Sequence, residues 1–157
     1  MPSFGTTSSA ERSPFGPAMA ASMTYALTLG MAALDSVRKR KARPILIVDD
    51  DSAIRDAERQ ILADNGFRVI EARDGGEAMR AIDIDPPALI VLDVQMPGVD
   101  GPTFARALRS RLRRVPLVIL TGVADPVREA DRCNAEAFLR KPFDADELVR
   151  VVRRFAS

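Results

Sequence analysis

Four short apolar runs in this sequence are each followed by side chains that can take part in phosphoryl chemistry. Acids, a hydroxyl and an ammonium follow them at Asp49, Asp50, Asp51, Asp93, Thr121 and Lys141. Carboxylates that lie close together repel, at about 4 kcal/mol for two unit charges about 4 Å apart in an effective dielectric of about 20. A hard cation such as Mg²⁺, which binds carboxylates, waters and phosphate oxygens, would offset that repulsion. With a lysine ammonium for the phosphate, the set suits phosphoryl transfer, and a carboxylate can itself be the nucleophile.

These residues can meet only if the runs that precede them lie side by side in one sheet. Strands are predicted at residues 45–48, 67–70, 88–92, 117–120 and 137–139, and helices at residues 53–63, 77–84, 104–112, 127–134 and 145–155. Uninterrupted aliphatic runs indicate strands that are buried on both faces of a parallel sheet. Alternation with helices and right-handed crossovers predict an α/β fold with a doubly wound parallel sheet. Ligands of such a sheet bind at the carboxyl ends of its strands, where these polar residues stand.

The composition narrows the chemistry further. The 157 residues suggest one domain, and a formal net charge of +1 gives no reason to expect direct contact with nucleic acid. The sequence contains no histidine, which excludes histidine-ligated metal sites and Ser-His-Asp triads built from this chain alone. Cys133 is the single cysteine and fits a reducing compartment, so we expect a cytoplasmic protein.

Residues 1–42 differ from the rest and are predicted to form a poorly ordered or partly helical extension. The first part is rich in serine, threonine, glycine and proline. Residues 13–34 carry no charge and precede a basic stretch that begins at Arg38, a pattern also found beside membrane anchors. A spanning helix needs about 20 predominantly apolar residues, which this run lacks, so we expect no membrane contact. The alternatives are an amphipathic helix that binds a partner and a start codon placed upstream of the true one.

Four stretches of the sequence resemble the signatures of response-regulator receiver domains. They are residues 48–50 (VDD), 92–101 (LDVQMPGVDG), 120–122 (LTG) and 138–143 (FLRKPF), in the family's order at the ends of predicted strands. The resemblance implies a receiver domain at residues 43–157, with a flavodoxin-like five-stranded sheet in the order 2-1-3-4-5 and helices on both faces. It also implies a stand-alone switch with no output domain in the chain, rather than an enzyme that acts on other molecules.

By this resemblance, Asp93 is the phosphoacceptor. Mg²⁺ would be held by Asp49, Asp50 and Asp93, with the backbone carbonyl of Gln95 as the remaining protein ligand. Lys141 would pair with the phosphoryl group and assist its transfer to Asp93. The phosphoryl donor would be a histidine kinase or a phosphotransfer protein.

The resemblance further implies a switch that a downstream protein target reads. Thr121, which also assists the transfer, moves toward the phosphoryl group on activation, and Phe138 turns inward with it. The alternative for Phe138 is a core position without a switching role. The bond from Lys141 to Pro142 would be cis, a state largely confined to proline. Asp51 falls where the first predicted helix begins and is interpreted as its N-terminal cap.

Two other functions fit parts of this pattern. Aspartate-based phosphatases resemble Asp-x-Asp-x-Thr after the first strand, whereas here Asp93 follows the third predicted strand and Gln95 stands two residues later. A degenerate receiver would bind partners without being phosphorylated, but the acceptor, metal, lysine and threonine positions are all filled in this sequence. We therefore favour a phosphoacceptor.

Overall fold

The computed structural model describes residues 28–31, 33–34, 42–98, 100–111 and 114–156. The chain divides into two units, residues 1–38 and residues 39–157. In the first unit the described residues are helical and exposed, and the rest of the predicted extension, apart from Ala42, lies outside the described residues. None of the helices in the described ranges is long and apolar enough to cross a membrane.

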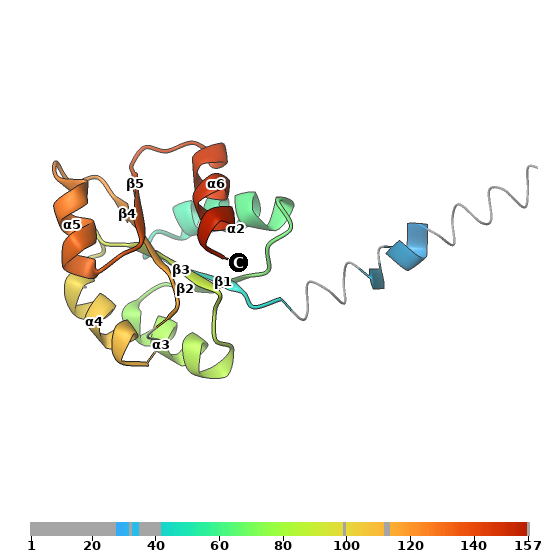
Figure 1. Ribbon diagram of the computed structural model, residues 1–157, viewed down its shortest axis with the longest axis horizontal. Helices are drawn as coiled ribbons and strands as arrows, with labels where there is room; N and C mark the ends of the chain where they lie inside the picture. Colours follow the sequence, from blue (N-terminus) through green and yellow to red (C-terminus); the bar gives the residue numbers. More distant parts are fainter. Residues whose placement is uncertain (1–27, 32, 35–41, 99, 112–113, 157) are drawn as a thin grey trace, which may run out of the picture. The chain divides into compact units, whose positions relative to one another are not determined.

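Strands and helices alternate along the second unit. The strands are β1 (Ile45–Val48), β2 (Val69–Ala72), β3 (Leu89–Asp93), β4 (Leu117–Thr121) and β5 (Ala137–Arg140). The helices are α2 (Ser52–Asp64), α3 (Gly75–Ile84), α4 (Gly101–Arg111), α5 (Pro126–Cys133) and α6 (Ala145–Phe155). The described strands pair in parallel in the order β2-β1-β3-β4-β5, which confirms the predicted doubly wound, flavodoxin-like sheet (Figure 1).

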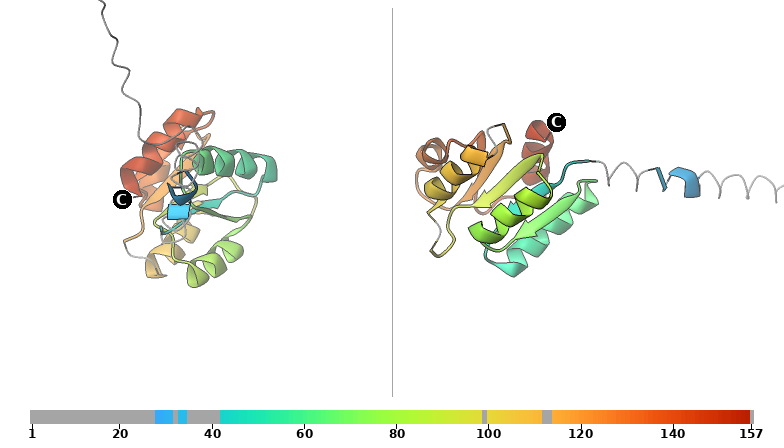
Figure 2. Two further views of the ribbon diagram at one scale, coloured as in Figure 1. Left: turned by 90° about the vertical axis from the view of Figure 1, so that its right-hand side faces the viewer. Right: turned by 90° about the horizontal axis from the view of Figure 1, so that it is seen from below.

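The sheet lies between two layers of helices, one on each face (Figure 1, Figure 2), and an apolar cluster fills the space between the sheet and each layer. Helices α2 and α6 cover one face and pack against a cluster that includes Ile45 and Ile47 of β1. Helices α3, α4 and α5 cover the other face, whose cluster includes Leu46 and Val48. Successive side chains of a strand point to opposite faces, so all four residues of β1 are buried. Each such side chain stabilises the fold by about 1.5–3 kcal/mol when fully buried, which fixes the strands from both sides.

Helices α2, α3, α5 and α6 each begin at an aspartate cap. The capping residues are Asp51, Asp74, Asp125 and Asp144. Each side chain accepts a backbone N–H of the first turn, which has no partner within the helix, and such a cap typically contributes about 0.5–2 kcal/mol. The prediction that Asp51 is a cap is confirmed, since its Oδ1 accepts the N–H groups of Ala53 (2.8 Å) and Ile54 (3.2 Å).

The second strand begins two residues later than predicted, at Val69 rather than at Phe67. The N–H of Phe67 donates to the carbonyl of Leu62 (3.1 Å) at the end of α2, and so it does not join the sheet. Pairing starts where the N–H of Ile45 donates to the carbonyl of Arg68 (2.8 Å). The other elements begin and end within about three residues of their predicted bounds.

Candidate functional site

Three carboxylates meet at the carboxyl edge of the sheet. Asp49 and Asp50 follow β1 directly, and Asp93 is the last residue of the neighbouring strand β3. One oxygen from each lies within 4.8 Å of the others, an arrangement that suits a divalent cation with oxygen ligands. Asp49 is fully buried and Asp93 is 5% exposed, whereas Asp50 is open to solvent. The structure therefore brings together the three predicted metal-binding aspartates and leaves one of them where water reaches it.

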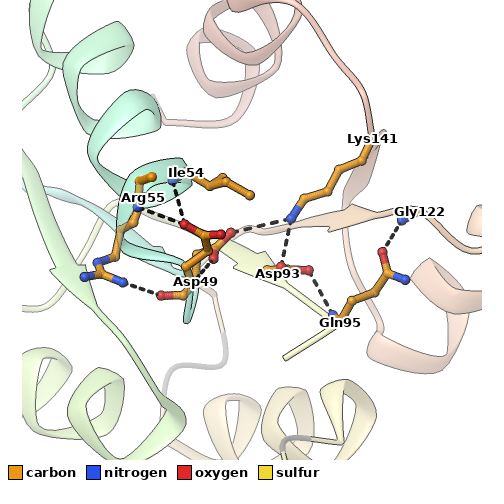
Figure 3. Close-up of polar contacts among 9 residues, drawn as sticks. Asp49, Ile54, Arg55, Asp93, Gln95, Gly122 and Lys141 are labelled. Atoms are coloured by element: carbon orange, nitrogen blue, oxygen red, sulfur yellow. Dashed lines mark hydrogen bonds and ion pairs between the residues drawn. The ribbon is translucent and has the colours of Figure 1, made fainter. Parts of the chain in front are cut away.

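Lys141 places its ammonium between two of these acids. It follows β5 directly, and its peptide bond to Pro142 is cis, as predicted. The Nζ atom donates to Oδ2 of Asp93 at 2.8 Å and to Oδ2 of Asp49 at 3.5 Å (Figure 3). Burial lowers the pKa of Lys141, but the hydrogen bond with Asp93 and the charges of both acids raise it more, so the net shift is upward. The ammonium therefore stays charged at neutral pH.

Ionisation of the Asp49 carboxyl group is harder than in water. Burial raises the pKa of Asp49 and the charge of Asp93 adds to this, whereas the N–H of Asp51 and the ammonium of Lys141 lower it; the net shift is upward. Oδ1 of Asp49 accepts the N–H of Asp51 (2.8 Å), and its backbone carbonyl accepts Nη1 of Arg55 (2.8 Å) (Figure 3). A divalent cation at the three carboxylates would favour the ionised form again, so the donor set fits Mg²⁺.

Asp93 is held at both carboxylate oxygens. Oδ1 accepts the N–H of Gln95 at 2.9 Å, and Oδ2 accepts the ammonium of Lys141. Gln95 also reaches the next loop, because its side-chain Oε1 accepts the N–H of Gly122 at 2.6 Å (Figure 3). This side-chain contact was not predicted, since nothing in the spacing signals a bond between residues 27 apart in the sequence.

The two predicted switch residues lie on neighbouring strands. Thr121 ends β4 and is fully buried, and its Oγ1 accepts the N–H of Val123 at 3.2 Å. Phe138 in β5 is half-buried and packs against the cluster beneath α3, α4 and α5. This position is compatible with a core role and with a switching role, so the movement of Phe138 stays a prediction.

One acid near this edge of the sheet was not predicted. Glu58 in α2 is 2% exposed, and neither carboxylate oxygen has a hydrogen-bond partner among the described residues. Burial above all, and then the charge of Asp49, raise the pKa of Glu58 to about 8. Its neighbour Ala57 is exposed, so it is Glu58 that points inward from this helix.

The sequence of a known family matches most of the chain. The response regulator receiver domain family matches residues 45–153. Response regulator MprA of Mycolicibacterium vanbaalenii is 42% identical over 112 residues, which are 69% of this chain and 48% of that protein. The chain thus spans about half the length of the curated relatives it matches.

Solved structures share both the fold and a detectable part of the sequence. The chemotaxis protein CheY4 of Vibrio cholerae is similar with a TM-score of 0.67 and 30% identity, over 73% of this chain and 98% of that one. The receiver domain of NtrX from Brucella abortus is similar with a TM-score of 0.67 and 34% identity, over 71% of this chain and 97% of that one. This chain belongs to the response regulator receiver domain family of two-component signalling.

Proposed function

We propose that the chain accepts a phosphoryl group on Asp93 in a Mg²⁺-dependent reaction and thereby changes a protein-binding surface. The observation that carries this proposal is the setting of the Asp93 carboxylate. It stands at the carboxyl end of β3, next to Asp49 and Asp50, with the ammonium of Lys141 at 2.8 Å. A nucleophile, a candidate cation site and a fixed positive charge are thus within one small site.

The transfer needs little from the protein beyond positioning and charge. A carboxylate oxygen of Asp93 forms the new bond to phosphorus, while the bond from phosphorus to the donor's imidazole nitrogen breaks and its electron pair returns to the ring. The N–H of Gln95 holds one oxygen of Asp93 during this step. The charged Lys141 lies beside the other oxygen, where it neutralises the incoming phosphoryl group.

Asp49, Asp50 and Asp93 would hold the cation, and the resemblance adds the backbone carbonyl of Gln95. When bound, Mg²⁺ supplies positive charge to the phosphoryl oxygens. Asp49 is buried and lies on the inner side of this site, whereas Asp50 is exposed and keeps the site accessible to the cation.

The proposed switch begins at Thr121, whose hydroxyl moves toward the phosphoryl group, and continues through Phe138. The surface that changes would include α5, β5 and α6, which a downstream protein target contacts. The donor would be a histidine kinase or a phosphotransfer protein in the cytoplasm. The chain would act as a phosphoacceptor switch rather than as an enzyme on other molecules.

Intact-mass spectrometry tests this proposal. The purified protein is mixed with Mg²⁺ and a small-molecule phosphodonor, beside an Asp93→Asn variant, with and without a chelator. We expect a gain of one phosphoryl group that needs Mg²⁺ and is absent in the variant. An equal gain in the Asp93→Asn variant, or no gain in folded wild-type protein that binds Mg²⁺ and is also offered a phosphorylated histidine kinase, would refute it.

A further inference from the structure

The loop between β4 and α5, residues 122–125, is tied to both neighbouring strand ends by side chains. From the β3 side, Oε1 of Gln95 accepts the N–H of Gly122 at 2.6 Å (Figure 3). From the β5 side, Nη2 of Arg140 donates to the carbonyl of Ala124 at 2.8 Å. The loop that follows Thr121 is therefore held from two directions by residues outside it.

The tie from the β3 side depends on a close approach to a glycine. A Cβ added to Gly122 would lie only 2.8 Å from Oε1 of Gln95, so even alanine would displace the amide. The backbone N–H of Gln95 meanwhile donates to Oδ1 of Asp93. One residue thus links the proposed phosphoacceptor to the loop that follows β4.

The hydroxyl of Thr121 contacts the loop of residues 122–125 that follows it. Its Oγ1 accepts the N–H of Val123, and within the described residues it has no hydrogen bond to the carboxylate of Asp93 or to the ammonium of Lys141. The proposed movement of Thr121 toward a phosphoryl group on Asp93 would change this arrangement. Any restraint on residues 122–125 opposes that change.

We propose that Gln95 and Arg140 are positioning residues that hold residues 122–125 in the unphosphorylated arrangement. Phosphorylation of Asp93 then has to break at least one of the two ties before Thr121 can turn. This inference rests on the proposed function, because it concerns the response of the loop to a group on Asp93. It predicts that removing either hydrogen bond makes activation easier. Among the described contacts, Arg140 has no hydrogen bond or ion pair with an acid of the site, so an effect of replacing it would come through the loop.

Binding of beryllofluoride, a tetrahedral mimic of a phosphoryl group on aspartate, measures this effect in the full chain. The variants are Gln95→Met and Arg140→Met, which keep the length of each side chain and remove its hydrogen bond. The matched control is Arg111→Met, because Arg111 is also exposed and pairs with Asp83 at 2.6 Å, away from the loop. Titrations with Mg²⁺ present are followed by calorimetry, and NMR follows hydrogen exchange at the amide of Gly122.

Both ties are exposed hydrogen bonds, so each is expected to change the affinity only about twofold to fivefold. Gln95→Met and Arg140→Met should bind beryllofluoride tighter by this factor, and Arg111→Met should bind as wild type does. In Gln95→Met the amide of Gly122 should exchange faster even without ligand. A purely structural role would lower the free energy of unfolding without tightening this binding.

Two failures can be told apart. If wild type and variants bind beryllofluoride equally well, the two side chains do not restrain the switch and this inference is overturned, while the phosphoacceptor function stands. If the folded wild type does not bind beryllofluoride at all, the proposed function fails, and the inference fails with it.

Discussion

Replacing Glu58 with glutamine should stabilise the protein, and the gain should grow with pH. The carboxylate of Glu58 is buried without a hydrogen-bond partner among the described residues, and its pKa is raised from 4.5 to about 8. For an acid whose pKa is higher in the folded state, folding takes up a proton. The stability linked to protonation of Glu58 is therefore fully present below pH 4.5 and is lost as the pH rises toward and through about 8. The reason is that Glu58 ionises at a lower pH in the unfolded chain than in the folded protein.

The size of the effect follows from the two pKa values. Each unit of difference corresponds to about 1.4 kcal/mol, so the interval from 4.5 to about 8 amounts to about 5 kcal/mol at alkaline pH and about 3 kcal/mol at pH 7. Native domains have unfolding free energies of about 5–15 kcal/mol, so a change of this order is measurable. Glutamine has nearly the same shape and cannot ionise, which leaves this dependence as the main difference between the two proteins. Glu58→Leu also removes the unpartnered polar atoms and should stabilise more than Glu58→Gln at every pH.

Urea unfolding at pH 5, 6, 7, 8 and 9, with a chelator to keep the carboxylate cluster free of metal, measures the difference. The gain of Glu58→Gln over wild type should rise by about 1.4 kcal/mol per pH unit and level off above about pH 8. The control is Asp56→Asn, on the exposed side of the same helix, which should show no comparable rise. A gain that is constant from pH 5 to pH 9 would refute the reasoning, since it would mean that Glu58 ionises equally easily in both states.

Three further predictions concern the site, the cysteine and the extension. Lys141→Met should tighten Mg²⁺ binding by about tenfold in calorimetry, because the ammonium beside Asp49 and Asp93 competes with the cation. Phosphorylation of the same variant should be slower than that of wild type. Weaker Mg²⁺ binding would contradict this prediction. Cys133 is 1% exposed, and burial raises the pKa of its thiol to about 11. At pH 8 a thiol reagent should therefore modify Cys133 at least about 100-fold more slowly in folded protein than in protein unfolded by guanidinium. Equal rates would show that the thiol is accessible in the folded protein. Deleting residues 1–42 should leave Mg²⁺-dependent phosphorylation intact in the mass assay, because the family match begins at residue 45. A truncated protein that folds but is not phosphorylated would show that the domain needs those residues.

Much of the fold and of the site could be predicted because the relevant signals are local. The apolar runs locate the strands, and parallel strands bring their carboxyl ends to one edge, so the residues that follow the runs had to meet there. This holds for Asp49, Asp93 and Thr121, which the structure places at the carboxyl ends of adjacent strands. The strand order and the roles of these residues came from the resemblance to a family, and those roles stay proposals.

The contact between Gln95 and Gly122 could not be predicted for a different reason. Gln95 is exposed and has several rotatable bonds, so its orientation depends on which loop lies beside it. That loop comes 27 residues later in the sequence, after α4 and β4, and the hydrogen bond also needs a residue without a Cβ at position 122. The order of residue types along the sequence shows neither that this loop lies beside Gln95 nor that the two residues approach so closely.

Glu58 shows the limit of helical periodicity most clearly. Ala57 and Glu58 both stand three or four residues from Ile54 and Ile61, so spacing alone allows either to face inward, and hydropathy selects the alanine. The rotation of the helix is fixed by Leu62, which is fully buried. Residues four apart lie one above the other on a helix, so Glu58 is carried into the same layer as Leu62, while Ala57 is turned away by roughly 100°. The apolar layers on both faces of the sheet supply more stability than one buried acid removes, so the fold keeps this rotation despite the cost of about 3 kcal/mol at pH 7.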